Sequence, residues 1–436
     1  MKPVKVGLLG LGTVGGGTVN VLRENGDAIA QRLGAPIQIV HASARDLSKA
    51  RICDTTGIML TTDPREVVDN PELDVVVELM GGDGIAREMV LRAIANGKHV
   101  VTANKMLLAK HGSEVFAAAR EKGVMVAFEA AVAGGIPVIK AIREGLAANR
   151  IEWLVGIING TGNFILTAMR DDDREFADVL AEAQRLGYAE ADPTFDVEGI
   201  DAAHKLTILA SIAFGIPPRL ENVYTEGITR ITRDDVKYAD ELGYRIKALG
   251  IARRTDKGVE LRVHPTLIPE GRLIANVDGV NNAVLVKGNM VGPTMYYGAG
   301  AGAGPTASAV VADLIDVARG MNAPGDCRVP CLAFQPEAIA ELPVLSMDEV
   351  ETAFYLRMKA VDKPGVLSKI SSALSDFQIS IEAVIQKEPK HGERQVDLVI
   401  LTNVVKEAIM NEAMRRLESS DTIAGPIAHI RVEHLD

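Results

Sequence analysis

The sequence has few cysteines and few aromatic residues. Its three cysteines, Cys53, Cys327 and Cys331, are too few and too scattered for a disulfide framework, which favours a reduced, cytoplasmic location. Cys327 and Cys331 lie close enough in sequence to approach each other. Without histidine or further cysteine nearby they would make a poor metal site, so we interpret them as two ordinary thiols.

Positive charge is also scarce. The chain carries 47 basic and 58 acidic residues, a net charge of −11. Nucleic acid and anionic membranes attract concentrated positive charge, so we expect neither as a partner. The net charge does not exclude small anionic ligands. No apolar stretch approaches the roughly 20 residues that cross a bilayer. The N-terminus starts like a signal peptide. It is dense in glycine and has no small-residue cleavage pattern, so we reject that interpretation.

The length of 436 residues and the ordinary share of hydrophobic residues predict a globular protein of two or three domains. In the N-terminal part of the chain, short apolar strands alternate with amphipathic helices. This pattern predicts a Rossmann-type parallel sheet covered on both faces. Strands are expected in VKVGLLG, PIQIVHASA, DVVVELM, HVVTAN and VMVAFEAAV, and one helix in TVNVLRENGDAIAQRLG.

From Ile151 the pattern changes to longer helices and separated strands, which predicts an α+β domain with its own sheet. A proline-containing stretch without periodicity then reads as a linker. The last part reads as strand, helix, strand, strand, helix, strand, a ferredoxin-like βαββαβ unit. We therefore divide the chain into residues 1–130, 131–304, a linker at 322–347, and 350–436.

A GxGxxG motif, Gly10, Gly12 and Gly15, stands between the first predicted strand and a helix. This context predicts a dinucleotide site, because the glycines let the backbone approach a pyrophosphate at a helix N-terminus. After the second strand come Ser43 and Arg45 instead of an acidic residue. Arg45 suits a 2′-phosphate and favours NADPH, while Asp46 keeps NADH open.

Two later segments offer polar groups to a substrate. Lys105 follows a predicted strand at the sheet edge where ligands bind, although a solvated loop lysine is an equal alternative. The segment NGTGNF, with Thr161, opens a predicted helix and suits a carboxylate. An ordinary helix N-cap explains that segment equally well.

The densest cluster of charges is LGYAEADPTFDVEGIDAAHK. Asp201 and Lys205 are four residues apart on one helix face and lead into an apolar run. They are either a surface ion pair or an acid and a base at the wall of a pocket. Burial would lower the pKa of the lysine toward a value useful for proton transfer, and nearby carboxylates would oppose that shift. The carboxylates could also hold a substrate ammonium group.

This cluster closely resembles the signature of homoserine dehydrogenases. The signature residues are Ala183, Gly187, Tyr188, Ala189, Asp192, Pro193, Asp196, Val197, Gly199, Asp201 and Lys205. GLLGLGTVG, TANK, EAAVAGGIP, GIINGTGNF and GAGAGAGPTASAVVADL match the family too, so the resemblance spans nearly all of residues 1–320.

The resemblance implies an NAD(P)-dependent oxidoreductase that interconverts L-homoserine and L-aspartate 4-semialdehyde, on the route to threonine, methionine and isoleucine. It implies that Lys205 exchanges a proton with the reacting oxygen and that Lys105 lies beside that oxygen and the nicotinamide. The implied substrate residues are Glu190 for the ammonium group, Asp201 for the hydroxyl or its water, and Thr161, Tyr188 and Asp196. The implied cofactor residues are Gly10, Gly12, Thr13, Val14, Gly15, Arg45, Lys105, Gly187 and Gly302.

In the family, EAAVAGGIP binds a monovalent cation, Na⁺ or K⁺, mainly through backbone oxygens. Here the matching residues are Glu129, Val132, Gly134 and Ile136. The helix at about 305–320 is expected to return to the nucleotide domain. The central domain is expected to carry both catalysis and dimerisation, giving a homodimer or homotetramer.

The C-terminal unit resembles an ACT domain through DKPGVLSKIS, with Asp362, Gly365, Val366 and Leu367 in the first turn. The resemblance implies feedback inhibition by L-threonine, and a purely structural dimerisation module is the alternative. Two alternatives remain for the whole chain: a Rossmann dehydrogenase for another amino-acid aldehyde, and a non-catalytic nucleotide and amino-acid sensor.

Overall fold

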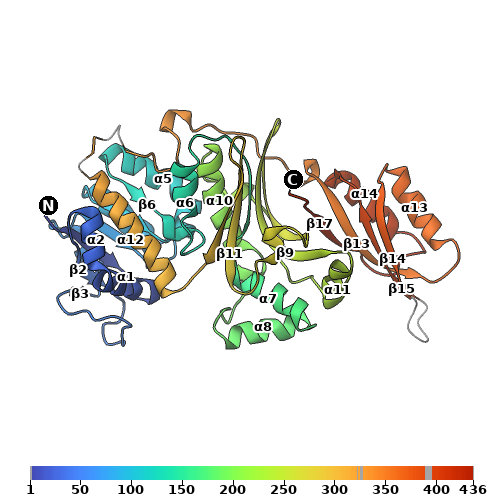
Figure 1. Cartoon of the computed structure of the whole chain (residues 1–436), viewed down its shortest axis with the longest axis horizontal. Coiled ribbons are helices and arrows are strands. Elements are labelled where there is room, and N and C mark those ends of the chain that lie inside the picture. Colours follow the sequence, from blue (N-terminus) through green and yellow to red (C-terminus); the bar gives the residue numbers. More distant parts are fainter. Residues whose placement is uncertain (1, 322, 325–327, 388–394, 436) are drawn as a thin grey trace.

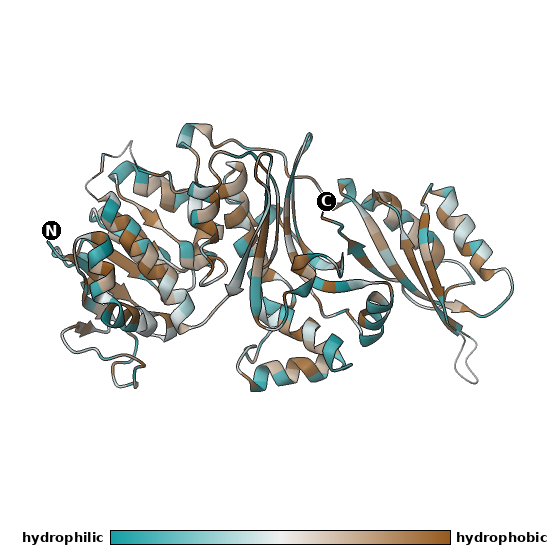
Figure 2. Cartoon of the chain, in the orientation of Figure 1, coloured by the Kyte–Doolittle hydropathy of each residue, from teal (hydrophilic) through white to brown (hydrophobic). Residues whose placement is uncertain are grey.

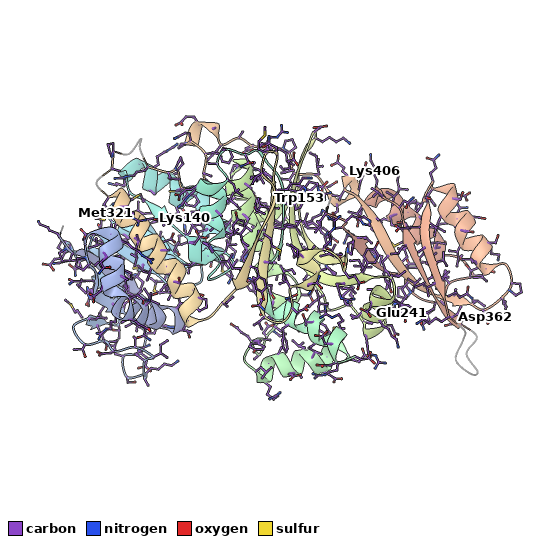
Figure 3. The ribbon with its side chains drawn as sticks, viewed as in Figure 1. Lys140, Trp153, Glu241, Met321, Asp362 and Lys406 are labelled. Carbon is purple, nitrogen blue, oxygen red and sulfur yellow. The ribbon has the colours of Figure 1, made fainter. Side chains whose placement is uncertain are left out.

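The computed structural model describes residues 2–321, 323–324, 328–387 and 395–435. Cys327 lies outside these residues, and with it the question of its pairing. The molecule is elongated, with three parts in a row from the N-terminal sheet to the C-terminal unit (Figure 1). Trp153 lies in the middle part and Asp362 at the outer end of the C-terminal unit (Figure 3). Within the described ranges, no helix is both long and apolar enough to cross a membrane.

The N-terminal part is built on a six-stranded, wholly parallel sheet in the order β3-β2-β1-β4-β5-β6. This is the Rossmann strand order, so the predicted fold class is confirmed. The strands are β1 (Val4–Leu9), β2 (Ile37–Ser43), β3 (Met59–Thr61), β4 (Val75–Glu78), β5 (His99–Thr102) and β6 (Val126–Ala127).

Helices cover both faces of this sheet, with their apolar sides turned inward (Figure 2). One face carries α1 (Thr13–Glu24), α2 (Gly26–Leu33) and α12 (Ala303–Gly320). The other carries α3 (Pro64–Asp69), α4 (Ile85–Ala95) and α5 (Lys105–Lys122). The prediction of one helix after the glycine turn is wrong. The chain forms α1 and α2 with a break at Asn25, because an Asn-Gly pair weakens the helix there.

The glycine turn between β1 and α1 depends on two of its glycines. Gly10 has φ +101°, a conformation that other residues rarely adopt. A Cβ on Gly15 would lie 2.0 Å from the carbonyl oxygen of Gly10. Any larger residue at Gly15 would therefore push the first turn of α1 away from the strand.

A second sheet of eleven strands runs through the middle and C-terminal parts. Its main path is β12-β11-β7-β9-β10-β17-β13-β15-β14, with β8 paired to β10 and β16 to β13. The strands are β7 (Ile151–Ile157), β8 (Tyr224–Thr225), β9 (Tyr244–Thr255), β10 (Gly258–Pro269), β11 (Asn281–Gly288), β12 (Gly292–Ala299), β13 (Glu351–Val361), β14 (Ile381–Gln386), β15 (Gln395–Thr402), β16 (Val405–Lys406) and β17 (Ala428–Val432).

The helices of these two parts pack on the sheet or at its ends. In the middle part they are α6 (Val138–Lys140), α7 (Gly160–Asp171), α8 (Phe176–Arg185), α9 (Thr194–Val197), α10 (Ile200–Phe214) and α11 (Arg233–Glu241). The C-terminal unit adds α13 (Val366–Asp376) and α14 (Glu407–Glu418), so β13-α13-β14-β15-α14-β17 follows the predicted βαββαβ order. Single turns of other helix types are η1 (Glu129–Ala131), η2 (Ala141–Gly145), η3 (Leu220–Asn222), η4 (Leu273–Asn276), η6 (Pro336–Ala338) and η7 (Met347–Glu349).

Strand β17 joins the two parts, because it pairs with β10 on one side and with β13 on the other. Buried ion pairs reinforce this junction. The guanidinium of Arg431 on β17 binds both oxygens of Glu407 and lies 2.7 Å from Glu226. Arg262 on β10 lies 2.5 Å from Glu433, just past β17. Both arginines are almost fully buried, so their partners neutralise charges that water cannot reach.

Replacing Arg431 by methionine should therefore destabilise the protein strongly. The change leaves Glu407 buried without a cation, which costs on the order of 3–5 kcal/mol in the free energy of unfolding. Arg416→Met is the matched control, because the Arg416 ion pair with Asp376 is half exposed. Thermal unfolding should show a large loss for the first variant and almost none for the second. Equal effects would contradict this role of the junction.

Candidate active site

Helix α10 is a core helix that carries charged residues. It starts after Gly199, which has φ +79°, and every residue from Asp201 to Phe214 is buried. The side chains of Asp201 and Lys205 are only 5% and 11% exposed. The interpretation of these two residues as a surface ion pair is therefore wrong. Both charges lie in the folded interior.

The carboxylate of Asp201 binds two lysines from different parts of the chain. Lys205 Nζ lies 2.6 Å from Asp201 Oδ2, and Lys105 Nζ lies 3.0 Å from Asp201 Oδ1. Lys205 Nζ also donates a hydrogen bond of 2.6 Å to the carbonyl oxygen of Ile158. The carboxylate thus holds two ammonium groups on its two oxygens, so both lysines are fixed at one place.

Lys105 reaches this place from the edge of the parallel sheet. It is the first residue of α5, three positions after β5 ends, and the Asn104 side chain caps the helix by accepting from Leu107 N. Thr102 Oγ1 donates to the buried carboxylate of Glu78, which also accepts from the backbone of Met80. At 33% exposure, the Lys105 side chain is the more accessible of the two lysines. The solvated-loop alternative for Lys105 is therefore wrong.

Electrostatics keep Asp201 ionised and weaken the proton affinity of Lys205. Burial opposes the charge of Asp201, but the nearby Lys205 and Lys105 outweigh it and lower its pKa. Burial lowers the pKa of Lys205, Lys105 acts in the same direction, and Asp201 acts against them. The neighbouring Asp196 has its pKa raised, chiefly by burial. Lys205 is thus suited to release or accept a proton.

Asn159 is a central residue of the site that the sequence analysis missed. Its Oδ1 caps α7 by accepting from Gly162 N at 2.7 Å, so the N-cap interpretation of NGTGNF is correct. Its Nδ2 donates to Asp196 at 2.7 Å and to Asp201 at 2.9 Å. The capping preference of asparagine was a signal for the first role. The second role joins residues far apart in sequence, and no local pattern reports it.

Phe195 is a second residue that the sequence analysis missed. The Lys105 ammonium lies 5.8 Å from the centre of its ring, within the range of a cation–π contact. The ring of His204 packs edge-on against the same ring at 5.3 Å. Burial lowers the pKa of His204 to about 4, so this neighbour adds no positive charge beside Lys105.

Other predicted substrate residues lie on the loop between α8 and α9. Thr161 donates to the carbonyl oxygen of Tyr188 at 2.6 Å, which ties this loop to the start of α7. The Tyr188 ring packs against that of Phe164, and the residue as a whole is 44% exposed. Glu190 is exposed, and its carboxylate contacts neither lysine among the interactions of the described residues. The structure thus brings Thr161 and Tyr188 together and leaves the Glu190 side chain outside the cluster.

Some of the predicted cofactor residues lie in the glycine turn or on the segment that follows β2 beside it. Gly10 N donates to the carbonyl oxygen of Ser43 at the end of β2, and the exposed Arg45 follows two residues later. Arg51, which the sequence analysis did not single out, donates to Leu11 O at 2.9 Å and ties this segment to the glycine turn. Gly187 and Gly302 have φ +78° and +120°, and Gly302 directly precedes α12.

The loop that is predicted to bind a cation, residues 129–136, fits such a site only partly. Ala133 and Gly134 are consecutive residues with positive φ, which turns the chain sharply between Val132 and Ile136. The Glu129 carboxylate accepts from two backbone N–H groups, Ile139 and Lys140, so it holds η1 against α6. Among the described residues, no group of three or more His, Cys, Asp or Glu side chains forms a metal site.

Comparisons with known proteins match this architecture over the whole chain. The family model described as homoserine dehydrogenase matches residues 137–315, its NAD binding domain matches residues 10–129, and an ACT domain model matches residues 354–421. The homoserine dehydrogenase of Pseudomonas aeruginosa is 62% identical over 436 residues and is covered fully, as is this chain. The chain belongs to the homoserine dehydrogenase family.

Solved homoserine dehydrogenases have the same fold. The Thiobacillus denitrificans structure is 64% identical with a TM-score of 0.95, covering 100% of this chain and 99% of that chain. A hyperthermophilic archaeal homoserine dehydrogenase in complex with NADPH is 27% identical with a TM-score of 0.62, covering 73% of this chain and 98% of that chain. The chain is accordingly an NAD(P)-dependent oxidoreductase with a C-terminal ACT domain, as the sequence predicted.

The charges around Lys205 predict opposite effects on the pH dependence of homoserine oxidation. With Lys205 as the expected base, oxidation would require its neutral form, so kcat/KM should rise with pH through a pKa below the usual 10.5. Lys105→Met removes a neighbouring positive charge and should raise that pKa, whereas Asp201→Asn removes a negative charge and should lower it. Residual activity measured over pH checks both signs. Shifts in the same direction would contradict this assignment.

Proposed function

We propose that this protein interconverts L-homoserine and L-aspartate 4-semialdehyde by hydride transfer, with Lys205 as the acid and base. The observation that carries the proposal is the buried carboxylate of Asp201, which holds Lys105 and Lys205 together at the end of the cofactor sheet. An alkoxide that develops during aldehyde reduction needs cationic donors held in place beforehand, and these two lysines supply them.

Each residue of this cluster has a distinct task in the proposed mechanism. In the oxidative direction, neutral Lys205 accepts the hydroxyl proton of homoserine as the carbon–oxygen double bond forms. The glycine turn would hold the nicotinamide cofactor, which would supply the acceptor for the hydride that leaves the hydroxyl-bearing carbon. Lys105 stabilises the negative charge on the oxygen, and Asp201 orients both lysines and the hydroxyl or its water. In the reductive direction the proton returns from Lys205 to the alkoxide.

The same proposal assigns the rest of the substrate pocket. Asp196 and Thr161 border the cluster through Asn159 and the Tyr188 loop. Glu190 lies on that loop with its carboxylate exposed and free of either lysine, and we assign it to the substrate ammonium group. The alternative, an aldehyde of another amino acid, is tested by comparing turnover of L-homoserine with that of other amino alcohols.

NADPH is the proposed preferred cofactor. The glycine turn at Gly10, Gly12, Thr13, Val14 and Gly15 would hold its pyrophosphate, Arg45 its 2′-phosphate, and Gly187 and Gly302 would let the chain approach it. The backbone oxygens of Glu129, Val132, Gly134 and Ile136 would hold Na⁺ or K⁺, which would brace the connection between the two sheets. We also propose that the chain divides into a nucleotide-binding, a catalytic and a regulatory domain.

Regulation is the last part of the proposal. The ACT domain supports an amino-acid effector, for which we propose L-threonine, an end product of the biosynthetic route. We also propose a cytoplasmic homodimer or homotetramer. A truncation before β13 is a poor test of regulation, because it would remove β17 from β10 and Glu433 from buried Arg262. Point variants of the intact chain avoid this defect.

Lys205→Ala should lower kcat for homoserine oxidation by at least about a hundredfold, the usual scale of acid–base catalysis. Cofactor affinity should stay near that of the wild type, because Lys205 lies on α10 and not on the glycine turn. Steady-state kinetics with a cofactor titration measure both quantities. A variant that retains most of its kcat would rule out the role of Lys205.

Arg45→Ala should raise KM for NADPH much more than KM for NADH, because only NADPH carries the 2′-phosphate. Lys49→Ala is the matched control, since Lys49 is an exposed cation of the same segment. It should change both KM values by less than about twofold, in line with other surface substitutions. Equal losses for the two cofactors in Arg45→Ala would show that Arg45 does not read the phosphate.

A further inference from the structure

Glu78 is a fully buried acidic residue at the edge of the parallel sheet where ligands bind. It is the last residue of β4, and its exposed fraction is 0%. Its partner in the sheet is Thr102, the last residue of β5, three positions before Lys105. In an open α/β sheet a dinucleotide lies beyond the carboxyl ends of the strands. Glu78 thus stands directly behind the expected place of the cofactor.

The hydrogen bonds of Glu78 fit an ionised carboxylate. Its Oε1 accepts from the backbone N–H groups of Met80 at 2.7 Å and Gly81 at 3.0 Å. Its Oε2 accepts from the hydroxyl of Thr102 at 2.8 Å. A carboxyl group that accepts at both oxygens and donates from neither is in its charged form.

This carboxylate has no cation beside it. Glu78 forms no ion pair with any lysine, arginine or histidine of the described ranges. Lys105, at the start of α5, binds Asp201. Lys110, on the same helix, binds Asp83. Burying a charge without a cation is costly, so the negative charge of Glu78 calls for a reason beyond packing.

Glu78 also holds together the two loops that follow β4 and β5. The hydroxyl of Thr102 that donates to Glu78 accepts from the backbone N–H of Asn104 at 3.0 Å. The side-chain amide of Asn104 in turn donates to the carbonyl oxygen of Gly82 at 2.6 Å. Lys105 follows directly in the chain. The carboxylate is thus linked by hydrogen bonds to the loop that presents Lys105.

The space beside these loops can receive a dinucleotide. Gly81 and Gly82 both have φ +75°, and a Cβ on either would meet no atom within 4 Å. The same is true of Gly12 in the glycine turn. The two loops lie against each other, because a Cβ on Gly10 would lie 2.8 Å from the carbonyl oxygen of Leu79. Both therefore offer bare backbone that a cofactor can approach.

The two redox forms of a nicotinamide cofactor differ in charge at the ring. The oxidised ring carries one positive charge, and the reduced ring carries none. The protein interior screens charge less than water does, so a buried carboxylate without a cation acts beyond its direct contacts. Glu78 attracts the oxidised ring and leaves the reduced ring little affected. Asp201 is less suited to this task, because two lysines already neutralise it.

We propose that Glu78 is the counter-charge of the oxidised nicotinamide and thereby sets the relative affinity of the enzyme for the two redox forms of its cofactor. Because it is fully buried, it acts through its charge and not by contact. This inference rests on the proposed oxidation of homoserine with a nicotinamide cofactor. It goes further by assigning a residue that distinguishes the oxidised from the reduced cofactor, which differ at the ring and not at the pyrophosphate or the 2′-phosphate.

The test measures the Kd of NADP⁺ and of NADPH for the full-length enzyme by isothermal titration without substrate. Glu78→Gln removes the charge and keeps the size of the side chain. It should raise the Kd of NADP⁺ relative to that of NADPH by at least about threefold, because a nearby negative charge is lost. NAD⁺ and NADH should show the same shift, since they carry the same ring. Should this variant not fold, Glu78→Ala removes the same charge and should give the same shift.

Two variants keep the charge of Glu78 and control for the structure of the loops. Glu78→Asp should leave the ratio of the two Kd values as in the wild type, even if both rise. Thr102→Val removes the hydroxyl between Glu78 and Asn104, so it should raise both Kd values together. Thermal unfolding shows that each variant is folded.

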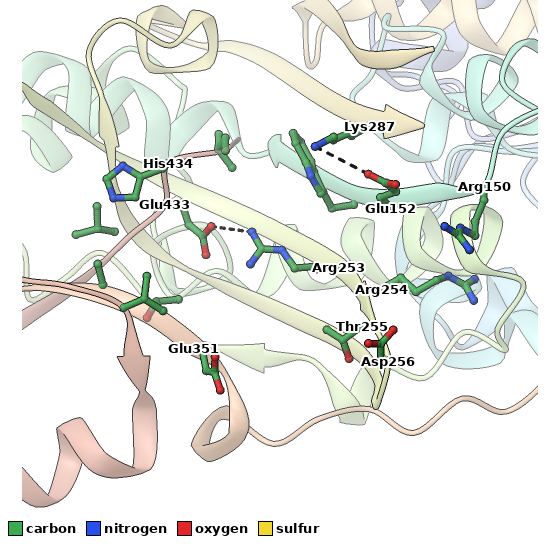
Figure 4. Close-up of a pocket in the computed structure, with 16 residues that line it drawn as sticks. Arg150, Glu152, Arg253, Arg254, Thr255, Asp256, Lys287, Glu351, Glu433 and His434 are labelled. Carbon is green, nitrogen blue, oxygen red and sulfur yellow. Dashed lines mark hydrogen bonds and ion pairs between the residues drawn. The ribbon is translucent and has the colours of Figure 1, made fainter. Parts of the chain in front are cut away.

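Glu351→Gln controls for the loss of one negative charge elsewhere. Glu351 is exposed and lines a cavity of about 600 Å³ between the middle part and the C-terminal unit, where Figure 4 shows it. Its distance from the cofactor sheet and its exposure to water screen its charge from the nicotinamide. Both Kd values should stay near those of the wild type.

The outcomes separate this inference from the proposed function. An unchanged Kd ratio in Glu78→Gln would overturn the inference, and so would an equal shift of the ratio in Glu78→Asp or Thr102→Val, which would show a structural role alone. Absence of homoserine oxidation by the wild type would overturn the proposed function. The Kd ratio is measured without homoserine, so it decides the inference independently of that result.

Discussion

The candidate active site is built on one buried carboxylate that binds two lysines. Asp201 and Lys205 belong to a core helix, and Lys105 comes from α5, which follows β5 of the parallel sheet. Taking these charges out of water is costly, and their mutual contacts with Asn159 and the Ile158 carbonyl offset that cost. The same contacts bring groups from two domains to one point, so cofactor and substrate chemistry can meet there.

Much of this site follows from local sequence patterns. The spacing of Asp201 and Lys205 predicts a shared helix face, and the apolar residues that follow predict that this helix is buried. Gly10, Gly12 and Gly15 likewise predict the strand-turn-helix geometry. What the patterns do not contain is partnership across the chain. Asn159 meets residues 37 and 42 positions away, and its spacing shows only a cap.

The fold has the same division between local and distant information. Alternating strands and helices predict the parallel sheet, but the Asn-Gly pair that splits the first helix is a weak signal inside a periodic pattern. The βαββαβ order is readable too, whereas the insertion of β17 beside β10 is not. Ion pairs of Arg262 and Arg431 with acidic residues far along the chain accompany that contact, which makes the ACT domain continuous with the sheet of the middle part.

A crystal structure of the enzyme with L-homoserine and an oxidised cofactor that cannot accept hydride would decide whether the two lysines meet the reacting oxygen. The substrate hydroxyl oxygen should lie within about 3 Å of both Lys205 Nζ and Lys105 Nζ, with Asp201 still bound to the lysines. A hydroxyl oxygen bound elsewhere, with Lys205 still paired only to Asp201 and Ile158, would contradict this role of the lysines.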